Sequence, residues 1–267
     1  MKIGVFDSGL GGLFLMKPIV EALRHYEYLY LGDTAHLPYG DKSPDEVYRL
    51  ALAGVKYLLE QDCALVLVMC NTISAEALRR MQQEFLPSTF PDRRILGIII
   101  PTVEEIRGKR IGVLATKGTV NSETYIKEIH KLLPNAQVFQ QAAPKLVPMI
   151  ESGILNIPAY AKIVNSYLEP LIAKNIDTLI LGCTHYVVLK NQIRKLVPHN
   201  VRVISQDEII AEKVRGYLAR HPEIESKLSR TGTQTFTVTK LTPEFQAQAE
   251  KWFDKLLKLE EIQQPSL

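Results

Sequence analysis

Two segments of the sequence place residues that can exchange protons in the same arrangement. They read LVLVMCNT and TLILGCTH, and in each an apolar run ends at a cysteine, Cys70 or Cys183, that polar residues follow at once. A free cysteine is more often a small buried apolar residue than a reactive one, and we expect that role for Cys63. The repeated arrangement indicates a chemical role for the other two.

The expected positions of Cys70 and Cys183 suit acid–base catalysis. Each precedes an expected helix start, where unpaired N–H groups and the helix dipole lower the pKa of a thiol and hold a substrate carboxylate. Racemisation needs one acid–base group on each face of a planar carbanion, and one cysteine from each strand end would supply both. Cys183 and His185 could instead form the pair of a thiol-dependent hydrolase, which would leave Cys70 without a role.

Two further loops follow expected strands and carry polar residues. The first, FDSGLGG, contains Asp7, whose carboxylate could accept a substrate ammonium group or a cysteine proton. Its glycines do not match a dinucleotide or Walker motif, so they predict a tight turn that needs their unusual φ and ψ angles. The second, GDTAHLPYG at 32–40, either reverses the chain or reaches the same site as Asp7.

The elements that must position these residues alternate along the chain. Short, almost continuously apolar runs predict strands buried on both faces of a parallel sheet, at 2–6, 28–31, 64–69, 95–100, 110–115, 137–140, 178–181 and 201–205. Helices are predicted at 74–85, 122–133, 159–174 and 208–220, and after a Ser43 cap, with Pro44 in the first turn and Glu46 closing a capping box.

This alternation predicts an α/β fold of two similar domains, each with an open sheet of mostly parallel strands. We expect residues 1–98 and 207–267 to form the first domain and residues 99–206 the second, with chain crossings near Pro101 and near 205–207. Ligands bind at the carboxyl ends of strands in such sheets. The active site is therefore expected in the cleft between the domains, where each would present one cysteine.

Composition excludes several other classes of protein. The net charge is only +3 and no basic run is interleaved with aromatic residues, so no nucleic-acid partner is expected. No secretion signal or apolar stretch long enough for a membrane helix is found, which predicts a cytoplasmic protein without a membrane partner. Three cysteines without metal-site spacing indicate neither a disulfide framework nor a metal centre.

Taken together, several motifs closely resemble the glutamate racemases, from residue 1 to about residue 210. The matching segments are FDSGLGGL at 6–13, GDTAHLPYG at 32–40, CNTISAEAL at 70–78, GVLATKGTV at 112–120, LVPMIESG at 146–153 and GCTHY at 182–186. The resemblance implies an isomerase without cofactor or metal that interconverts L- and D-glutamate and supplies D-glutamate for peptidoglycan. It also implies two α/β domains and a homodimer.

The resemblance assigns roles to individual residues. It implies that Cys70 exchanges the proton of D-glutamate and Cys183 that of L-glutamate, assisted by Asp7 and His185 respectively, with Glu151 as a further acidic residue near the second side. The implied substrate-binding residues are Asp7, Ser8, Pro38, Tyr39, Gly40, Asn71, Thr72, Thr116, Thr119, Thr184 and His185.

The chain departs from the family pattern at Val187, where proline is common, and at 205–208, where an acidic residue and a serine are common. We expect these changes to affect element boundaries rather than catalysis. Because the chain begins directly at its first strand, activation by a cell-wall precursor is not expected. The alternatives are an aspartate or hydantoin racemase of the same superfamily and a clamp that binds an amino acid without chemistry.

Overall fold

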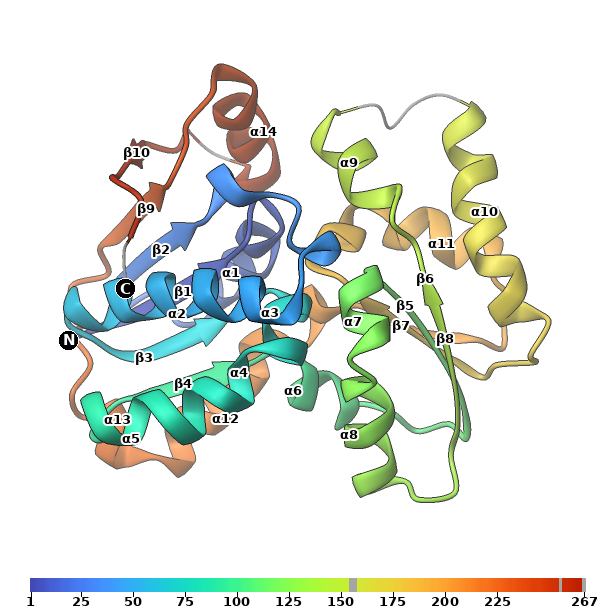
Figure 1. Ribbon diagram of the computed structural model, residues 1–267, viewed down its shortest axis with the longest axis horizontal. Coiled ribbons are helices and arrows are strands. Elements are labelled where there is room, and N and C mark those ends of the chain that lie inside the picture. Colours follow the sequence, from blue (N-terminus) through green and yellow to red (C-terminus); the bar gives the residue numbers. More distant parts are fainter. Residues whose placement is uncertain (154–157, 255, 266–267) are drawn as a thin grey trace.

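The structure, a computed structural model, describes residues 1–153, 158–254 and 256–265. The described strands form two sheets, one of six strands and one of four, and the pairings within both are parallel. Figure 1 shows the two sheets side by side, each with helices on both faces. This arrangement confirms the predicted α/β class.

The first sheet has the strand order β10-β9-β2-β1-β3-β4. Its three central strands are buried almost throughout, as their apolar sequences require. Val5 lies opposite Tyr30 on one side and Leu67 on the other. The strands are β1 (Lys2–Asp7), β2 (Tyr28–Gly32), β3 (Cys63–Val68), β4 (Arg94–Gly97), β9 (Gln234–Val238) and β10 (Leu259–Glu261).

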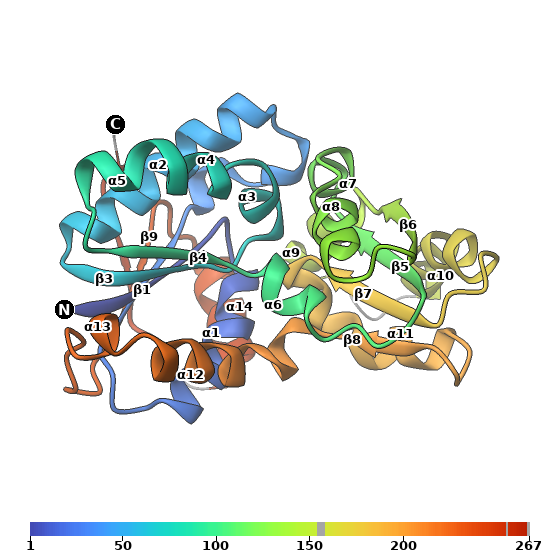
Figure 2. The same ribbon diagram turned by 90° about the horizontal axis from the view of Figure 1, so that it is seen from below.

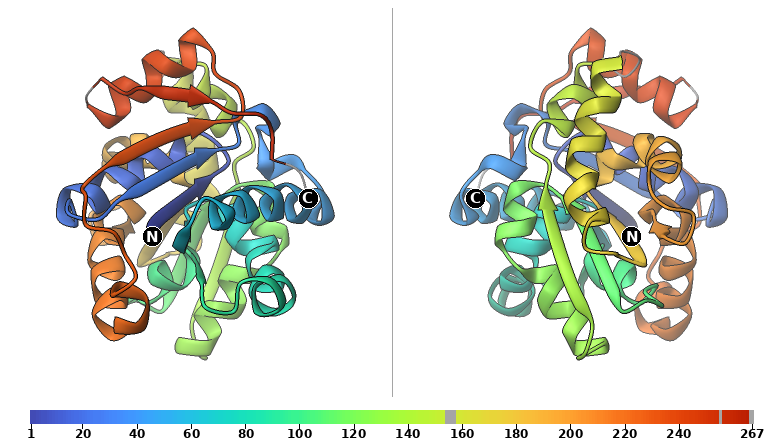
Figure 3. Two further views of the ribbon diagram at one scale, coloured as in Figure 1. Left: turned by 90° about the vertical axis from the view of Figure 1, so that its left-hand side faces the viewer. Right: turned by 90° about the vertical axis from the view of Figure 1, so that its right-hand side faces the viewer.

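The second sheet has the order β6-β5-β7-β8, with the buried strand β7 beside β5 at its centre. Figure 3 shows each half of the molecule from its own end, the first sheet on the left and the second on the right. The strands of the second sheet are β5 (Arg110–Ala115), β6 (Gln137–Ala142), β7 (Thr178–Gly182) and β8 (Arg202–Ile204).

Helices cover both faces of the first sheet, and each face has its own apolar core. Figure 2 shows one set of helices above the sheet and the other below it. One face carries α1 (Gly11–Ala22), α12 (Ile210–Arg220), α13 (Pro222–Glu225) and α14 (Pro243–Phe253). The other carries α2 (Pro44–Glu60), α3 (Asn71–Glu76), α4 (Leu78–Arg80), the π-helical turn η3 (Met81–Phe85) and α5 (Leu86–Thr89).

The second sheet is covered in the same way, again with one apolar core on each face. One face carries α6 (Ile99–Val103), α7 (Lys117–Asn121) and α8 (Thr124–Leu132), and the other carries α9 (Leu146–Glu151), α10 (Pro158–Ile172) and α11 (Lys190–Leu196). The 3-10 turns are η1 (Thr34–His36), η2 (Tyr39–Asp41), η4 (Thr184–Leu189) and η5 (Gln206–Glu208).

The start of α2 agrees with the sequence in part. Ser43 caps the helix by accepting a hydrogen bond from the Glu46 N–H at 3.3 Å, and Pro44 is the first helical residue. The carboxylate of Glu46, however, accepts a hydrogen bond from Lys42 Nζ at 2.8 Å. Instead of closing the predicted capping box, Glu46 forms an ion pair with Lys42, four residues earlier in the chain.

Three predictions about the elements were wrong. The apolar run 95–100 is divided between β4 and α6, because periodicity alone does not separate a buried strand from a short buried helix. The helix predicted from residue 74 begins at Asn71 and is broken into α3, α4 and η3. Strands β9 and β10 were missed, because β9 carries alternating polar residues and β10 has only three residues.

The chain crosses between the sheets after β4 and returns after β8. The second crossing runs through η5 into α12, which packs on the first sheet. The assignment of residues 1–98 with 207–267, and of 99–206, to two domains remains a prediction.

Candidate active site

A cavity of about 30 Å³ lies between the two sheets, at the carboxyl ends of their central strands. The first half lines it with Ser8, Leu37, Pro38, Tyr39, Gly40, Asp41, Cys70, Asn71 and Thr72. The second half lines it with Thr116, Lys117, Ala143, Pro144, Val147, Pro148, Cys183, Thr184 and His185. A volume of this size holds water but no amino acid, so a substrate could enter only if the lining elements move apart.

The structure brings most of the predicted site residues to this one cavity. Cys70 and Cys183, each 6% exposed, reach it from different sheets. Asp7, Thr119 and Glu151 are not part of the lining, and each lies behind a residue that is. Asp7 precedes Ser8 in the sequence, and its charge acts on Cys70. Thr119 contacts Thr72, and Glu151 contacts His185.

Cys70 occupies the cap position of α3 and accepts a hydrogen bond from Ser8 Oγ at 3.5 Å. Burial and, after it, the charge of Asp7 raise the pKa of Cys70 to about 12, despite the opposing effects of the Ile73 N–H and the Ser8 hydroxyl. The prediction that the helix start makes this thiol acidic was wrong, because the loss of solvation exceeds the effect of one helix end. Cys70 is therefore a neutral thiol at pH 7.

Cys183, His185 and Glu151 form a chain of polar contacts on the other side. His185 Nδ1 lies 3.8 Å from Cys183 Sγ, and His185 Nε2 lies 2.5 Å from Glu151 Oε1. Burial lowers the pKa of His185, but the contacts with Cys183 and Glu151 outweigh burial and hold it well above 6.5. At pH 7 the buried imidazole is positively charged, next to the sulfur.

Asp7 is fully buried at the end of β1. Its Oδ2 accepts a hydrogen bond from the Gly9 N–H at 2.9 Å, while its Oδ1 has no hydrogen-bond partner among the described residues. Burial raises the pKa of Asp7 to about 6, despite the opposing charge of His185 and the N–H groups of Gly9 and Gly12. A carboxyl group with this pKa changes its protonation state near neutral pH, as an assisting acid–base group must.

Replacing Asp7 with asparagine is expected to change how stability depends on pH and to lower activity. Because the folded-state pKa lies above the unfolded value of 3.8, the wild type loses stability as the pH rises through 6. The difference in unfolding free energy between D7N and the wild type should therefore shift by about 2 kcal/mol in favour of D7N when the pH is raised from 4 to 7. Urea denaturation of both proteins at both pH values measures this shift. In an assay of the expected racemisation, kcat of D7N should fall by a larger factor than its KM rises. A constant stability difference across this range would contradict the burial of a titrating carboxyl group.

Three threonines join the two halves beside the cavity. Thr72 Oγ1 lies 2.9 Å from Thr116 Oγ1 and 3.4 Å from Thr119 Oγ1, and the Thr116 hydroxyl donates to Thr119 Oγ1 at 3.0 Å. Thr116 also caps α7 by accepting a hydrogen bond from the Thr119 N–H at 3.3 Å. These hydroxyls can bind a carboxylate once the halves separate.

Two glycines allow the halves to approach each other. A Cβ atom on Gly11 would lie 2.2 Å from Thr184 Oγ1 and 2.8 Å from His185 Nδ1, and one on Gly40 would lie 2.7 Å from Thr116 Cβ. Neither glycine has a positive φ angle. The expectation that the glycine-rich loop needs unusual backbone angles was therefore wrong at Gly11, where close contact between the halves requires glycine.

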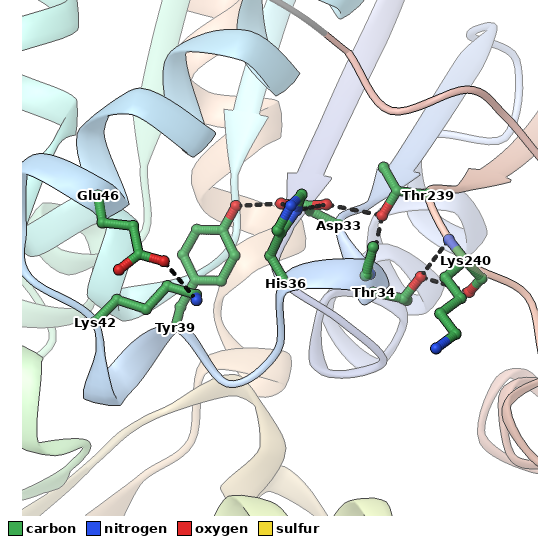
Figure 4. Close-up of polar contacts among 9 residues, drawn as sticks. Asp33, Thr34, His36, Tyr39, Lys42, Glu46, Thr239 and Lys240 are labelled. Atoms are coloured by element: carbon green, nitrogen blue, oxygen red, sulfur yellow. Dashed lines mark hydrogen bonds and ion pairs between the residues drawn. The ribbon is translucent and has the colours of Figure 1, made fainter.

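The loop that carries Tyr39 is fixed by Asp33, which is 5% exposed (Figure 4). Its carboxylate accepts hydrogen bonds from the hydroxyls of Tyr39 at 2.5 Å and of Thr239 at 2.7 Å, and His36 Nδ1 lies 2.9 Å from both of its oxygens. Thr239 follows β9, so the C-terminal part of the chain helps to hold this wall of the cavity.

The sequence missed several lining residues. Ala143, Pro144, Val147 and Pro148 follow β6, and the same rule that placed the cysteines, that ligands bind beyond the carboxyl ends of strands, would have found them. Their apolar or proline character gave no chemical signal.

Within the described ranges, no group of three or more His, Cys, Asp or Glu side chains is placed to hold a metal ion. Likewise, among the residues that the structure describes, no helix is long and apolar enough to cross a membrane. All three cysteines are free and buried.

Comparisons with known proteins find racemases, a class that agrees with an α/β fold carrying two thiols at one cavity between its sheets. Residues 3–214 match the family model described as Asp/Glu/hydantoin racemase, and the chain belongs to this family of isomerases. It is similar to the glutamate racemase of Synechocystis sp., with 34% identity over 268 residues, which covers 100% of this chain and 93% of that protein.

Solved structures give the same result. A glutamate racemase from Francisella tularensis in complex with D-glutamate has a TM-score of 0.88 and 30% identity, covering 98% of this chain and 97% of that one. An aspartate racemase from Picrophilus torridus has a TM-score of 0.52 and 20% identity, covering 95% of this chain and 100% of that one, and so shares the fold alone. Among these proteins, similarity in sequence and structure is greater to the glutamate racemases.

Proposed function

We propose that this protein is a glutamate racemase that interconverts L- and D-glutamate without a cofactor, with Cys70 and Cys183 as its two acid–base groups. The observation that carries the proposal is that both thiols line one cavity, each at the carboxyl end of a strand in a different sheet. Two such groups can act on opposite faces of a planar carbanion. The similarity to glutamate racemases supports glutamate as the substrate.

The surroundings of the two sulfurs differ. Cys70 is a neutral thiol, since burial and the charge of Asp7 raise its pKa to about 12. On the other side, His185 Nδ1 lies 3.8 Å from Cys183 Sγ and can exchange a proton with it. A racemase needs one base and one acid at the same moment, and in the proposed reaction with L-glutamate Cys183 is the base and Cys70 is the acid.

After one turnover the roles are exchanged. Cys183 has taken the α-proton of L-glutamate, and Cys70 has given its own proton to the opposite face of the carbanion. The Cys70 thiolate then lies near Asp7, whose pKa of about 6 allows it to become protonated and remove the repulsion. His185 and Glu151 keep the Cys183 side polarised through their 2.5 Å contact.

The substrate itself would be held by the polar lining. Ser8, Thr72 and Thr184 line the cavity, and their hydroxyls can bind carboxylates. Stabilising the carbanion in this way is the main catalytic demand, because the α-proton of a free amino acid is only weakly acidic. Closure of the two halves excludes water and strengthens these interactions.

The direct test is circular dichroism of L-glutamate incubated with the purified protein and no added cofactor. We expect the signal to decay to zero, and a D-glutamate sample to decay to the same value, because the equilibrium constant between enantiomers is one. Dialysis against EDTA should not change the rate, and no absorption band of pyridoxal phosphate should be present.

The same assay separates the alternatives. Racemisation of aspartate or a hydantoin but not of glutamate would identify a different member of the superfamily. Binding of glutamate without exchange of its α-hydrogen with solvent would identify a clamp, and a trapped acyl-enzyme would identify a hydrolase.

The setting of the activity is part of the proposal. We infer a cytoplasmic homodimer that supplies D-glutamate for peptidoglycan. Support comes from three cysteines that are all free, as in a reducing compartment, and from the role of the family that the chain resembles. Sedimentation of the purified protein tests the dimer.

A further inference from the structure

A second polar cluster extends from the cavity wall into the interior of the protein. Asn71 and Gln206 form a reciprocal pair, in which Asn71 Nδ2 donates to Gln206 Oε1 at 2.9 Å and Gln206 Nε2 donates to Asn71 Oδ1 at 3.0 Å. Gln206 Nε2 also lies 3.0 Å from Thr102 Oγ1 and 3.2 Å from the Tyr125 hydroxyl, which donates to Asn71 Oδ1 at 2.8 Å. All four residues are at most 2% exposed.

The members of this cluster come from four separate parts of the chain. Asn71 is the first residue of α3 and directly follows Cys70. Thr102 belongs to α6 on the first crossing between the sheets, Gln206 to η5 on the second crossing, and Tyr125 to α8. The cluster therefore connects both crossings to the residue next to one thiol.

The pairing fixes the orientation of Asn71. Its Oδ1 accepts two hydrogen bonds and its Nδ2 donates one. Because a buried amide that loses its partners costs stability, rotation of the Asn71 side chain is disfavoured as long as Gln206 is present. Gln206 belongs to the segment 205–208, where this chain departs from the family pattern, and it contacts Asn71, which lines the cavity.

We propose that Gln206 is a positioning residue that acts through Asn71 to place the Cys70 thiol for proton transfer. The inference rests on the proposed racemisation. No hydrogen bond of the cluster involves Cys183, His185 or Glu151, among the contacts of the described residues. Loss of Gln206 should therefore slow the transfer at Cys70 more than the transfer at Cys183.

Isotope effects separate the two transfers. The C–H bond of D-glutamate is broken by Cys70 and that of L-glutamate by Cys183, so α-deuterated D- and L-glutamate report on different thiols. In Gln206→Met, which keeps the volume and removes the amide, we expect kcat/KM to fall about tenfold, since small misplacements are costly. The isotope effect should rise for D-glutamate and fall for L-glutamate, because the slowed step becomes more fully rate-limiting.

Two further variants make the test specific. Gln82→Met is the matched control, because Gln82 also donates a hydrogen bond, to the Ile95 carbonyl at 2.7 Å, but lies outside this cluster; its isotope effects should equal those of the wild type. In an Asn71→Ala background, Gln206→Met should have no additional effect if Gln206 acts only through Asn71. Should Q206M not fold, Gln206→Glu keeps the acceptor for Asn71 Nδ2 and should show the same asymmetry, less strongly.

Wild-type racemisation is measured first and decides the proposed function independently. In an active, folded Gln206 variant, unchanged isotope effects, or equal changes for both enantiomers, would overturn the positioning role and leave the proposed function intact. Additive losses in the double variant would also overturn it.

Discussion

Cys70→Ala and Cys183→Ala should each abolish racemisation, with kcat falling by at least about 10³-fold both from L- to D-glutamate and from D- to L-glutamate. In the proposed mechanism each alanine removes the thiol that donates or accepts a proton on one face of the carbanion, so neither direction can be completed. The change in circular dichroism of L- and D-glutamate, followed for days at high enzyme concentration, measures the residual rates.

Cys63 provides the matched control. It is fully buried in β3, and burial raises its pKa to about 12, as for Cys70, but it lies outside the cavity lining. Cys63→Ala should keep kcat within about twofold and lose only about 1 kcal/mol of stability from the small volume removed. A folded Cys63→Ala protein as inactive as the other two variants would contradict the assignment of the catalytic thiols.

Much of this architecture could be predicted because the strands carry a strong signal. β1, β3 and β7 are almost continuously apolar; β1 ends at Asp7, and Cys70 and Cys183 follow shortly after the ends of β3 and β7. Strand periodicity and the position of ligand sites in parallel sheets therefore placed three polar groups together. What the sequence could not supply was the degree of burial. The thiol of Cys70 was expected to be acidic, and its burial beside Asp7 raises its pKa instead.

The missed parts share a physical cause, which is dependence on contacts between distant segments. β9 adds to the sheet through pairing with β2, and Thr239 just after it holds Asp33, although nothing in 234–239 resembles a site. Gln206 has no chemical signal of its own and acquires one only because the second crossing brings it to Asn71. Such residues are defined by the tertiary structure, and local patterns cannot identify them.

The two-thiol mechanism makes a second prediction of large effect, on the fate of the α-hydrogen. If one cysteine serves each face, the hydrogen removed from one enantiomer is not the hydrogen given to the other. In deuterium oxide, with L-glutamate as the starting material, the D-glutamate formed at low conversion should already carry deuterium at the α-carbon, because Cys70 has exchanged with solvent. The remaining L-glutamate should stay mostly protiated, and the pattern should be reversed from D-glutamate.

A single base that reaches both faces would give a different pattern. It would return part of the original hydrogen to the product and would also exchange hydrogen in the unreacted substrate. α-Proton NMR of both enantiomers at low conversion distinguishes the two cases. Substantial retention of the original hydrogen in the product would exclude opposite faces for Cys70 and Cys183, even though both line the same cavity. Deuterated product beside protiated substrate is expected instead, because the two sulfurs belong to different sheets and neither can cross to the other face while a substrate lies between them.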